Sequence, residues 1–323
     1  MDTKNLVLAL LEKNKGKSIS GTEIAKNLNV SRNAVWKSIN LLKKDGHIIQ
    51  GVNNRGYILS GNSIIMSAGG IVSYLPDNFN ANKIHVYNEL ESTNITAKEM
   101  AVNGFEHGTT VIANSQTNGK GRFNRPFYSP AGSGLYMSLI FRAKYINLNN
   151  ITMITAAAAT AVCKAIKTIT GKVAGIKWVN DILLDNKKIC GISTEAVTDF
   201  ESGEIDWIVT GIGINVTTNS FPDEYKDIAT SIFEDDAKLN VRNQLAAKII
   251  NSLTVSTDWI NDETVYNEYK KRLVLLGKEV TVITFDETYQ ALVLDIDKEC
   301  RLIVKKDDGS IIILNSGEIS LKL

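Results

Sequence analysis

The stretch "NVSRNAVWKSINLLKKDG", residues 29–46, spaces its apolar side chains as a helix does, with Ser31 near its start and a glycine at its end. Serine favours the N-cap position and glycine commonly follows a helix, so the stretch predicts a helix capped by Ser31. Residues 4–12 and 22–28 repeat the apolar spacing, and only the short "LNVS" turn separates the last two helices. A helix, a tight turn and a second helix form the arrangement of a DNA-reading motif.

The next stretch, "HIIQGVNNRGYILS" at 47–60, has two strand-like runs joined by a polar turn with glycine, which predicts a β-hairpin. Helices followed by such a hairpin make a winged helix. The candidate DNA contacts then lie at the start of the recognition helix and at the tip of the wing: Ser31, Arg32, Asn33, Trp36, Lys37, Asn54 and Arg55. Trp36 could equally be a core residue.

Charge is distributed unevenly along the chain. Residues 1–60 hold ten Lys/Arg against four Asp/Glu, a net charge of +6, whereas the remaining residues hold 26 against 31, a net charge of −5. A basic segment attached to an acidic body favours contact with nucleic acid. The alternative is a small helical cap whose lysines are only solvated.

The rest of the chain predicts an α+β protein of several domains. A loose segment with a short helix follows residue 60, and from residue 83 strand-like runs mix with one long alanine-rich helix at 151–170. The strand-like runs are 83–90, 108–116, 134–143, 175–185, 187–197 and 205–216. The end of the chain alternates in short runs around an Asp-Gly turn at 308–309 and predicts a small β-barrel.

Several classes of protein are unsupported. The three cysteines lie far apart and no His stands at metal spacing, so neither a disulfide framework nor a zinc site is expected. Nucleophile motifs such as Gly-x-Ser-x-Gly are absent, so catalysis would rest on Lys, Arg, Asp and backbone amides. The sequence lacks a signal peptide and a run of eighteen apolar residues, which predicts a cytoplasmic protein without a membrane segment.

A second decisive stretch is "NSQTNGKGRFNRPFYSP" at 114–130, which offers open backbone amides, glycines and fork-shaped cations. These groups match phosphate or carboxylate oxygens, so the stretch predicts an anion-binding loop. It is not a Walker loop, because position 114 is Asn and Lys120 is followed by glycine. Spacing alone leaves a merely flexible basic loop as an equal alternative.

Two more stretches favour a site for an anion. "KWVND" at 177–181 and "NKKICGI" at 186–192 each place Lys beside apolar strand residues, where a cation is costly without an anion. Asp181 adds a carboxylate suited to Mg²⁺. The alternative for Lys177 and Asp181 is a plain structural ion pair.

Together these motifs make the chain resemble the bacterial biotin protein ligases that also act as the biotin operon repressor. The resemblance covers essentially the whole chain and rests on several motifs in the family's order: "ESTN" (91–94), 115–130, "KWVND", "KKICGI", "GIGIN" (211–215) and the N-terminal helix and hairpin. It implies a winged helix at 1–62, a mixed α/β catalytic domain of the biotin/lipoate ligase type at 63–268, and an SH3-like barrel at 269–323. The implied reaction couples biotin to ATP and then passes biotin to a lysine of a biotin carboxyl carrier protein, as in acetyl-CoA or pyruvate carboxylase.

The resemblance also implies roles for individual residues. The implied biotin contacts are Ser92, Thr93, Asn94, Gln116, Lys120, Gly121, Arg122 and Lys188. The implied ATP or adenylate contacts are Gly119, Arg122, Arg125, Asn180, Gly211, Gly213 and Asn215, and the implied catalytic residues are Lys188, Arg122, Lys177 and Asp181, with Asp181 holding Mg²⁺. In the family the adenylate-bound protein dimerises on operator DNA, and a second lid is expected at 217–231.

The sequence departs from the family at a few positions. Lys120 stands where many relatives have Arg and keeps the charge without the bidentate fork, and Val179 replaces the usual proline. Two other functions stay open: a winged-helix sensor of a small acid without catalysis, and a relative that transfers lipoate.

Overall fold

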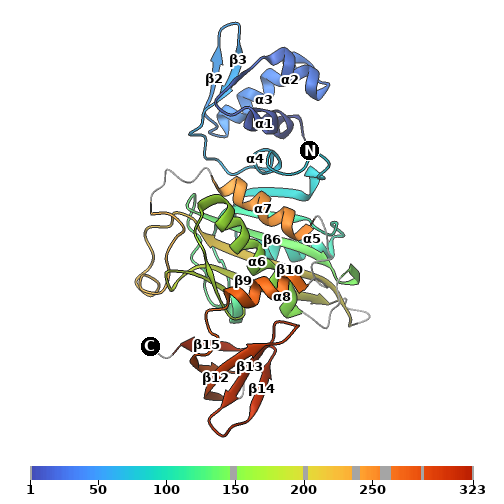
Figure 1. The fold of residues 1–323 in the computed structure, drawn as a ribbon. Coiled ribbons are helices and arrows are strands. Elements are labelled where there is room, and N and C mark those ends of the chain that lie inside the picture. The colour runs from blue at the N-terminus through green and yellow to red at the C-terminus, as the bar shows by residue number, and fades with distance from the viewer. Residues whose placement is uncertain are drawn as a thin grey trace.

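The computed structural model describes residues 2–145, 151–198, 203–234, 241–254, 263–284 and 287–321. Three bodies follow one another along the long direction of the molecule, with the N-terminal body and the C-terminal sheet at opposite ends (Figure 1). The N-terminal body contains α1 (Thr3–Lys13), β1 (Ser18–Ile19), α2 (Gly21–Leu28), α3 (Arg32–Lys44), β2 (Ile49–Val52) and β3 (Gly56–Leu59).

The N-terminal body is the predicted winged helix. The Ser31 hydroxyl accepts a hydrogen bond from the Ala34 amide at 3.1 Å, so the predicted cap of α3 is confirmed. Buried residues of α1, α2, α3 and the hairpin form one apolar cluster. Trp36 is 55% exposed, so its interpretation as a core residue is wrong. One strand was not predicted: β1 pairs with β3, where a Cβ on Gly56 would lie 2.1 Å from the Ile19 carbonyl oxygen.

The central body is built on a seven-stranded sheet in the order β4-β5-β6-β10-β9-β8-β7, in which only β4 and β5 pair in parallel. Its strands are β4 (Ile84–Leu90), β5 (Thr110–Gln116), β6 (Gly134–Arg142), β7 (Gly175–Lys177), β8 (Asp181–Leu184), β9 (Lys187–Thr198) and β10 (Ile205–Asn215). Its helices are α4 (Ala68–Val72), α5 (Thr93–Val102), α6 (Ile151–Thr170), α7 (Arg242–Thr254) and α8 (Glu263–Arg272), with single 3₁₀ turns at Ala81–Lys83, Arg122–Asn124 and Ala143–Tyr145.

The two faces of this sheet are covered differently. Apolar residues of α6, α7 and α8 pack on one face in the largest apolar cluster, and α5 covers part of the other face in a smaller cluster. Side chains alternate along a strand, so Met137 and Leu139 of β6 join the first cluster and Ile140 joins the second. The helix α6 is long and apolar enough to cross a membrane by composition alone, but 72% of its most apolar window is buried inside the protein. Its apolar character is therefore explained by the core.

The run 175–185, expected as one strand, folds instead as two. Strands β7 and β8 pair in antiparallel register with Lys177 opposite Asp181, which leaves Trp178–Asn180 in the turn between them. The Trp178 indole is buried and donates to the Cys300 carbonyl at 2.9 Å, and the Asn180 side chain donates to the Ile192 carbonyl at 3.1 Å. These long-range hydrogen bonds stabilise the turn, so the local sequence alone does not predict it.

The C-terminal body is a five-stranded antiparallel sheet in the order β14-β13-β12-β11-β15, which agrees with the expected small barrel. Its strands are β11 (Glu279–Ile283), β12 (Thr288–Ile296), β13 (Leu302–Lys306), β14 (Ile311–Leu314) and β15 (Glu318–Leu321). The Val274 amide donates to the Ile176 carbonyl at 2.9 Å, so the start of this body joins the edge strand of the central sheet.

Candidate active site

The candidate site lies on the α5 face of the central sheet, at the end that α5 leaves uncovered. On β10, Trp207 and Val209 pack against α5, and the next two side-chain positions on that face are Gly211 and Gly213. In the paired strands, Gly211 is opposite Ser138 and Ser193, and Gly213 is opposite Gly191. Small residues on three adjacent strands therefore leave a pocket where the apolar packing stops.

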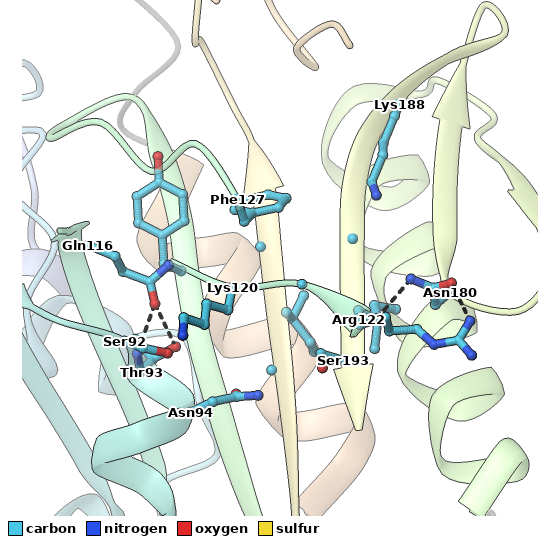
Figure 2. A pocket seen from close by; sticks show the side chains of 17 residues that line it. Ser92, Thr93, Asn94, Gln116, Lys120, Arg122, Phe127, Asn180, Lys188 and Ser193 are labelled. Atoms are coloured by element: carbon cyan, nitrogen blue, oxygen red, sulfur yellow. Dashed lines mark hydrogen bonds between the residues drawn. The ribbon is translucent and has the colours of Figure 1, made fainter. Parts of the chain in front are cut away.

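One wall of the pocket is a polar network at the start of α5. The Gln116 side-chain oxygen accepts from the Thr93 amide at 2.8 Å and from the Thr93 hydroxyl at 3.2 Å (Figure 2). The Gln116 nitrogen donates to the Ser129 hydroxyl at 2.9 Å, which fixes the orientation of the carboxamide. Ser92, at the N-cap position of α5, makes no side-chain capping bond and lines the pocket.

Asn94 forms the floor of the pocket beside Gly211. The Ser138 hydroxyl donates to the Asn94 side-chain oxygen at 2.6 Å, and the Asn94 nitrogen donates to the Glu195 carboxylate, which also pairs with Lys98 at 2.8 Å. A Cβ on Gly211 would lie 2.2 Å from the Asn94 oxygen. The glycine is therefore required by the close approach of this carboxamide.

Phe127 forms the apolar part of the pocket. Its ring stands over two glycines of neighbouring strands, because a Cβ on Gly213 would lie 2.5 Å from the ring and a Cβ on Gly191 would lie 3.4 Å from it. Tyr136 meets the same ring edge to face at 6.4 Å between centroids, and burial raises the pKa of the Tyr136 hydroxyl. An aromatic body with a few convergent polar groups is the usual composition of a site for a small organic ligand.

Two cations of the site, Arg122 and Lys188, lie on the opposite wall (Figure 2). Lys188 Nζ lies 2.7 Å from the Asp181 carboxylate, and Asn180 donates to the same carboxylate at 3.1 Å. Arg122 Nη1 donates to the Asn180 side-chain oxygen at 3.2 Å and to the Gly317 carbonyl at 3.2 Å. Burial lowers the pKa of Arg122, and the Asp181 charge opposes this shift, so the guanidinium stays charged at neutral pH. Arg122 and Lys188 thus carry positive charge to the same end of the pocket.

A second cavity of about 390 Å³ adjoins this cationic end and shares Arg122, Asn180 and Lys188 with the first pocket. It adds Lys177, Asp181 and Arg125, and aromatic side chains from the 217–231 segment, Phe221 and Tyr225, complete its wall. Arg125 pairs with Glu318 of β15, so the C-terminal sheet closes one side. The cavity has the size and the charge of a nucleotide subsite.

The segment 217–231 packs directly onto Lys188. The Lys188 amide donates to the Ile228 carbonyl at 2.8 Å, and the Thr230 amide donates to the Lys188 carbonyl at 2.9 Å. Asn215 is buried and donates to the Thr230 carbonyl at 3.2 Å, so its carboxamide supports this segment as well as lining the second cavity. The expected second lid therefore lies over the cationic end of the site.

The structure brings almost all the site residues named from the sequence together. The first pocket is lined by Ser92, Thr93, Asn94, Gln116, Lys120, Gly121, Arg122, Asn180, Lys188, Gly211 and Gly213, and the second cavity adds Arg125, Lys177, Asp181 and Asn215. Gly119 lines neither pocket: a Cβ there would meet Ser129, Phe127 and Gln116, so this glycine allows the loop to pack on itself. The candidate DNA contacts Ser31, Arg32, Asn33, Trp36, Lys37, Asn54 and Arg55 are all exposed, in the winged helix.

Sequence reasoning missed Phe127, Tyr136, Ser138, Glu195 and Glu318, which complete the site. Phe127 had a signal, because it stands inside the decisive loop. The others had none, because their role depends on strand register and on the distant C-terminal sheet.

Three family models match the chain. The biotin/lipoate A/B protein ligase family matches residues 87–215, a helix-turn-helix (HTH) domain matches 3–58, and the biotin protein ligase C-terminal domain matches 275–322. The segments matched by the three models correspond to the three bodies of the fold.

Known proteins are similar in sequence to this chain over nearly its whole length. The chain is 33% identical over 305 residues to the bifunctional ligase/repressor BirA of Bacillus subtilis, covering 90% of each protein, and 27% identical to BirA of Escherichia coli, covering 95% of this chain and 94% of that one. The solved biotin protein ligase of Aquifex aeolicus in complex with biotin and ATP superimposes with a TM-score of 0.63 at 25% identity, over 74% of this chain and 98% of that chain. The chain therefore belongs to the biotin protein ligase family, and it carries an N-terminal helix-turn-helix domain.

Proposed function

We propose that this protein is an ATP-dependent biotin protein ligase that also acts as a biotin-responsive transcriptional repressor. The observation that carries the ligase assignment is the junction of the two cavities. A small-ligand pocket with convergent polar groups opens, between Arg122 and Lys188, onto a basic cavity of nucleotide size. The full-length similarity to ligase/repressor proteins supports both activities.

The first step joins biotin to AMP. A carboxylate oxygen of biotin attacks the α-phosphorus of ATP, the bond from that phosphorus to the bridging oxygen breaks, and pyrophosphate leaves. Two anions must approach each other for this attack, so fixed cations at the junction lower its barrier. Lys188 and Arg122 stand at that junction, and we assign Arg125 and Lys177 to the phosphates beyond it.

Mg²⁺ fits the second cavity. The Asp181 carboxylate presents a hard oxygen ligand there, whereas the Asn180 side-chain oxygen accepts a hydrogen bond from Arg122. Mg²⁺ is commonly held by one or two protein ligands with phosphates and water. When bound, the ion supplies positive charge to the phosphate oxygens. Among the described residues, no group of three or more His, Cys, Asp or Glu side chains is placed so that it could hold a metal ion.

The second step transfers biotin to a protein. The neutral amine of a carrier lysine attacks the carbonyl carbon of the adenylate, an amide bond forms and AMP leaves. Water would hydrolyse the mixed anhydride, so the site must exclude it. The segments 117–130 and 217–231, which border the two cavities, are suited to do so.

The repressor assignment rests on the winged helix. Its candidate DNA contacts are exposed at the start of α3 and on the wing, and residues 1–60, which form this domain, carry the basic excess of the chain. We propose that the adenylate-bound protein dimerises on operator DNA in the cytoplasm, with a biotin carboxyl carrier protein as the competing partner. Analytical ultracentrifugation with biotin and Mg-ATP tests dimerisation, and an unchanged mass with both ligands would remove the regulatory part only.

The ligase is tested by the intact mass of an apo biotin-carrier domain after incubation with this protein, Mg-ATP and biotin. We expect a gain of one biotin that disappears without ATP. A parallel reaction with lipoate distinguishes the lipoate-transferring relative, and no gain in either reaction would leave a non-catalytic sensor as the better assignment.

A further inference from the structure

One buried cation connects the site loop, residues 117–133 between β5 and β6, to the segment that follows the winged helix. Arg242, the first residue of α7, is only 3% exposed. Its Nη1 donates to the Asn114 side-chain oxygen at 3.0 Å and to the Gly134 carbonyl at 3.4 Å, and its Nη2 donates to the Ile64 carbonyl at 3.2 Å. One guanidinium therefore contacts three segments that are far apart in the sequence.

Two of these contacts hold the ends of the site loop. Asn114 lies in β5 two residues before Gln116, and Gly134 is the first residue of β6. The residues between them include Lys120, Arg122 and the other residues of the loop that line the two cavities. The positions of Asn114 and Gly134 thus determine where the loop starts and ends.

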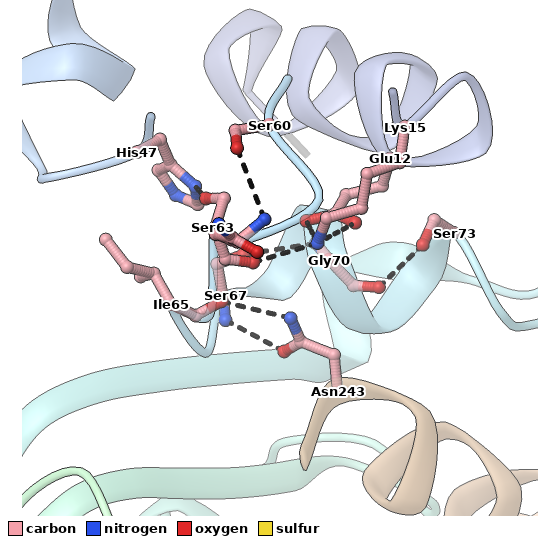
Figure 3. A network of polar contacts seen from close by, with 11 residues as sticks. Glu12, Lys15, His47, Ser60, Ser63, Ile65, Ser67, Gly70, Ser73 and Asn243 are labelled. Carbon is pink, nitrogen blue, oxygen red and sulfur yellow. Dashed lines mark hydrogen bonds and ion pairs between the residues drawn. The ribbon is translucent and has the colours of Figure 1, made fainter. Parts of the chain in front are cut away.

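The third contact holds the linker, residues 60–67 between β3 and α4, and the next residue of α7 also binds this linker. The Asn243 side chain accepts from the Ser67 amide at 3.2 Å and donates to the Ile65 carbonyl at 3.0 Å (Figure 3). A Cβ on Gly70 would lie 2.5 Å from the Asn243 nitrogen, so the glycine of α4 permits this close approach.

The other end of the linker is tied to the winged helix. Lys15 donates to the Ser63 carbonyl at 2.8 Å and pairs with the buried Glu12 at 3.0 Å (Figure 3). His47 Nδ1 lies 3.3 Å from the Ser63 hydroxyl, and burial lowers the pKa of His47 to about 4, so this ring is neutral at neutral pH. Ser63 is thus held by residues of the winged helix, while residues 64–67 are held by α7.

Burying the charged guanidinium of Arg242 costs free energy. Burial lowers the pKa of Arg242, and among the described residues no carboxylate forms an ion pair with it. A buried charge without a counter-ion is tolerated only when fixed dipoles surround it. Here the acceptors are two backbone carbonyls and one carboxamide, so all three segments must be in place to stabilise the guanidinium.

We propose that Arg242 is a positioning residue that links order in the site loop to the placement of the winged helix. Because one guanidinium serves both segments, any ligand that orders the loop at Asn114 and Gly134 also strengthens the hold on Ile64. By linkage, a winged helix fixed on DNA favours the ordered loop to the same extent. The inference rests on the proposed function, because biotin and ATP are the ligands that we propose for the two cavities that the loop borders.

The test is hydrogen exchange of the full-length protein, with and without biotin and Mg-ATP, read at the peptides covering 114–134 and 63–72. Local exchange reports the free energy of opening of each segment. We expect the ligands to slow exchange in both segments of the wild type. In Arg242→Met, exchange in the linker peptide should lose its response to the ligands.

Two further variants keep the test interpretable. Asn243→Ala removes a linker contact but leaves the bonds from Arg242 to Asn114 and Gly134, so the loop should still respond while the linker responds less. Gln244→Ala, the neighbouring position on α7, is the matched control and should behave as the wild type. The ligand-induced gain in DNA affinity should fall about fivefold or more in Arg242→Met and stay unchanged in the control.

The outcomes distinguish a failure of the proposed function from a failure of the linkage through Arg242. If neither segment of the wild type responds to biotin and ATP, the proposed function fails. If the loop responds and the linker does not, or if the linker of both Arg242→Met and Asn243→Ala responds as in the wild type, the linkage through Arg242 is wrong and the ligase assignment stands.

Discussion

Arg125 of the site loop donates two parallel hydrogen bonds to Glu318 of β15, Nη1 to Oε1 at 2.8 Å and Nη2 to Oε2. Together with the bond from Arg122 to the Gly317 carbonyl, this pair joins the loop to the C-terminal sheet beside the second cavity. The C-terminal sheet is thereby part of the candidate site.

This pair makes stability depend on pH. Hydrogen bonding to Arg125 lowers the pKa of Glu318 from its ordinary value of 4.5, so the folded protein holds the ionised form more strongly than the unfolded chain does. The stabilisation is present above pH 4.5 and is lost as the pH falls through the lower folded value. Arg125 is largely exposed, so the contribution should be at most about 1 kcal/mol. Glu318→Gln should therefore lower the melting temperature at pH 7, with a difference that shrinks below pH 4.5; a constant difference would contradict the assignment.

Lys188 should act in the first chemical step. Its ammonium lies 2.7 Å from Asp181 at the junction of the two cavities, so Lys188→Ala should remove charge that stabilises the attack on phosphorus. We expect a fall in the rate of pyrophosphate release on the order of 10²-fold to 10³-fold, the scale for losing one preorganised electrostatic contact. Lys187→Ala, which changes the exposed neighbour, is the control. An equal loss in both variants would point to a folding defect.

We expect biotin binding to require glycine at position 211, because the Asn94 carboxamide packs directly against it. A Cβ there would lie 2.2 Å from the Asn94 oxygen, so Gly211→Ala must displace this carboxamide and with it the bonds to Ser138 and Glu195. We expect the Kd for biotin, measured by calorimetry, to rise about tenfold or more, since each tenfold costs about 1.4 kcal/mol. Gly51→Ala, where a Cβ meets nothing within 4 Å, should leave the Kd unchanged.

The exposed residues of α3 should divide into two kinds of DNA contact. Lys37→Ala should weaken binding to all sequences and reduce the slope of log affinity against log salt by about 1, as expected for one lost phosphate contact. Trp36 is too exposed to serve the core, so Trp36→Ala should reduce the preference for selected sites over random DNA and leave the melting temperature nearly unchanged. Lys271→Ala, on α8, is the control. Binding measured by fluorescence anisotropy over a salt series distinguishes the two effects.

Much of the local structure could be predicted from residues alone. The Ser31 cap, the apolar spacing of α3 and the hairpin gave the winged helix because caps, turns and periodicity act within a few residues. Helices α5, α7 and α8 were not predicted: α8 buries only Val265 and Tyr269, so its apolar pattern is weak, and tertiary packing stabilises it.

The sequence by itself determined which motifs carry charge, which backbone is open to an anion, and the family to which these motifs point. Only the tertiary structure decided that residues 92–94, 116–122, 188 and 211–213 share one pocket, because their meeting depends on the order and register of the strands. The same holds for Phe127 over paired glycines, for Glu318 on Arg125 and for Arg242 between loop and linker. Each of these contacts joins segments that are far apart in the sequence. No local sequence pattern predicts such a contact, because only tertiary packing brings the segments together.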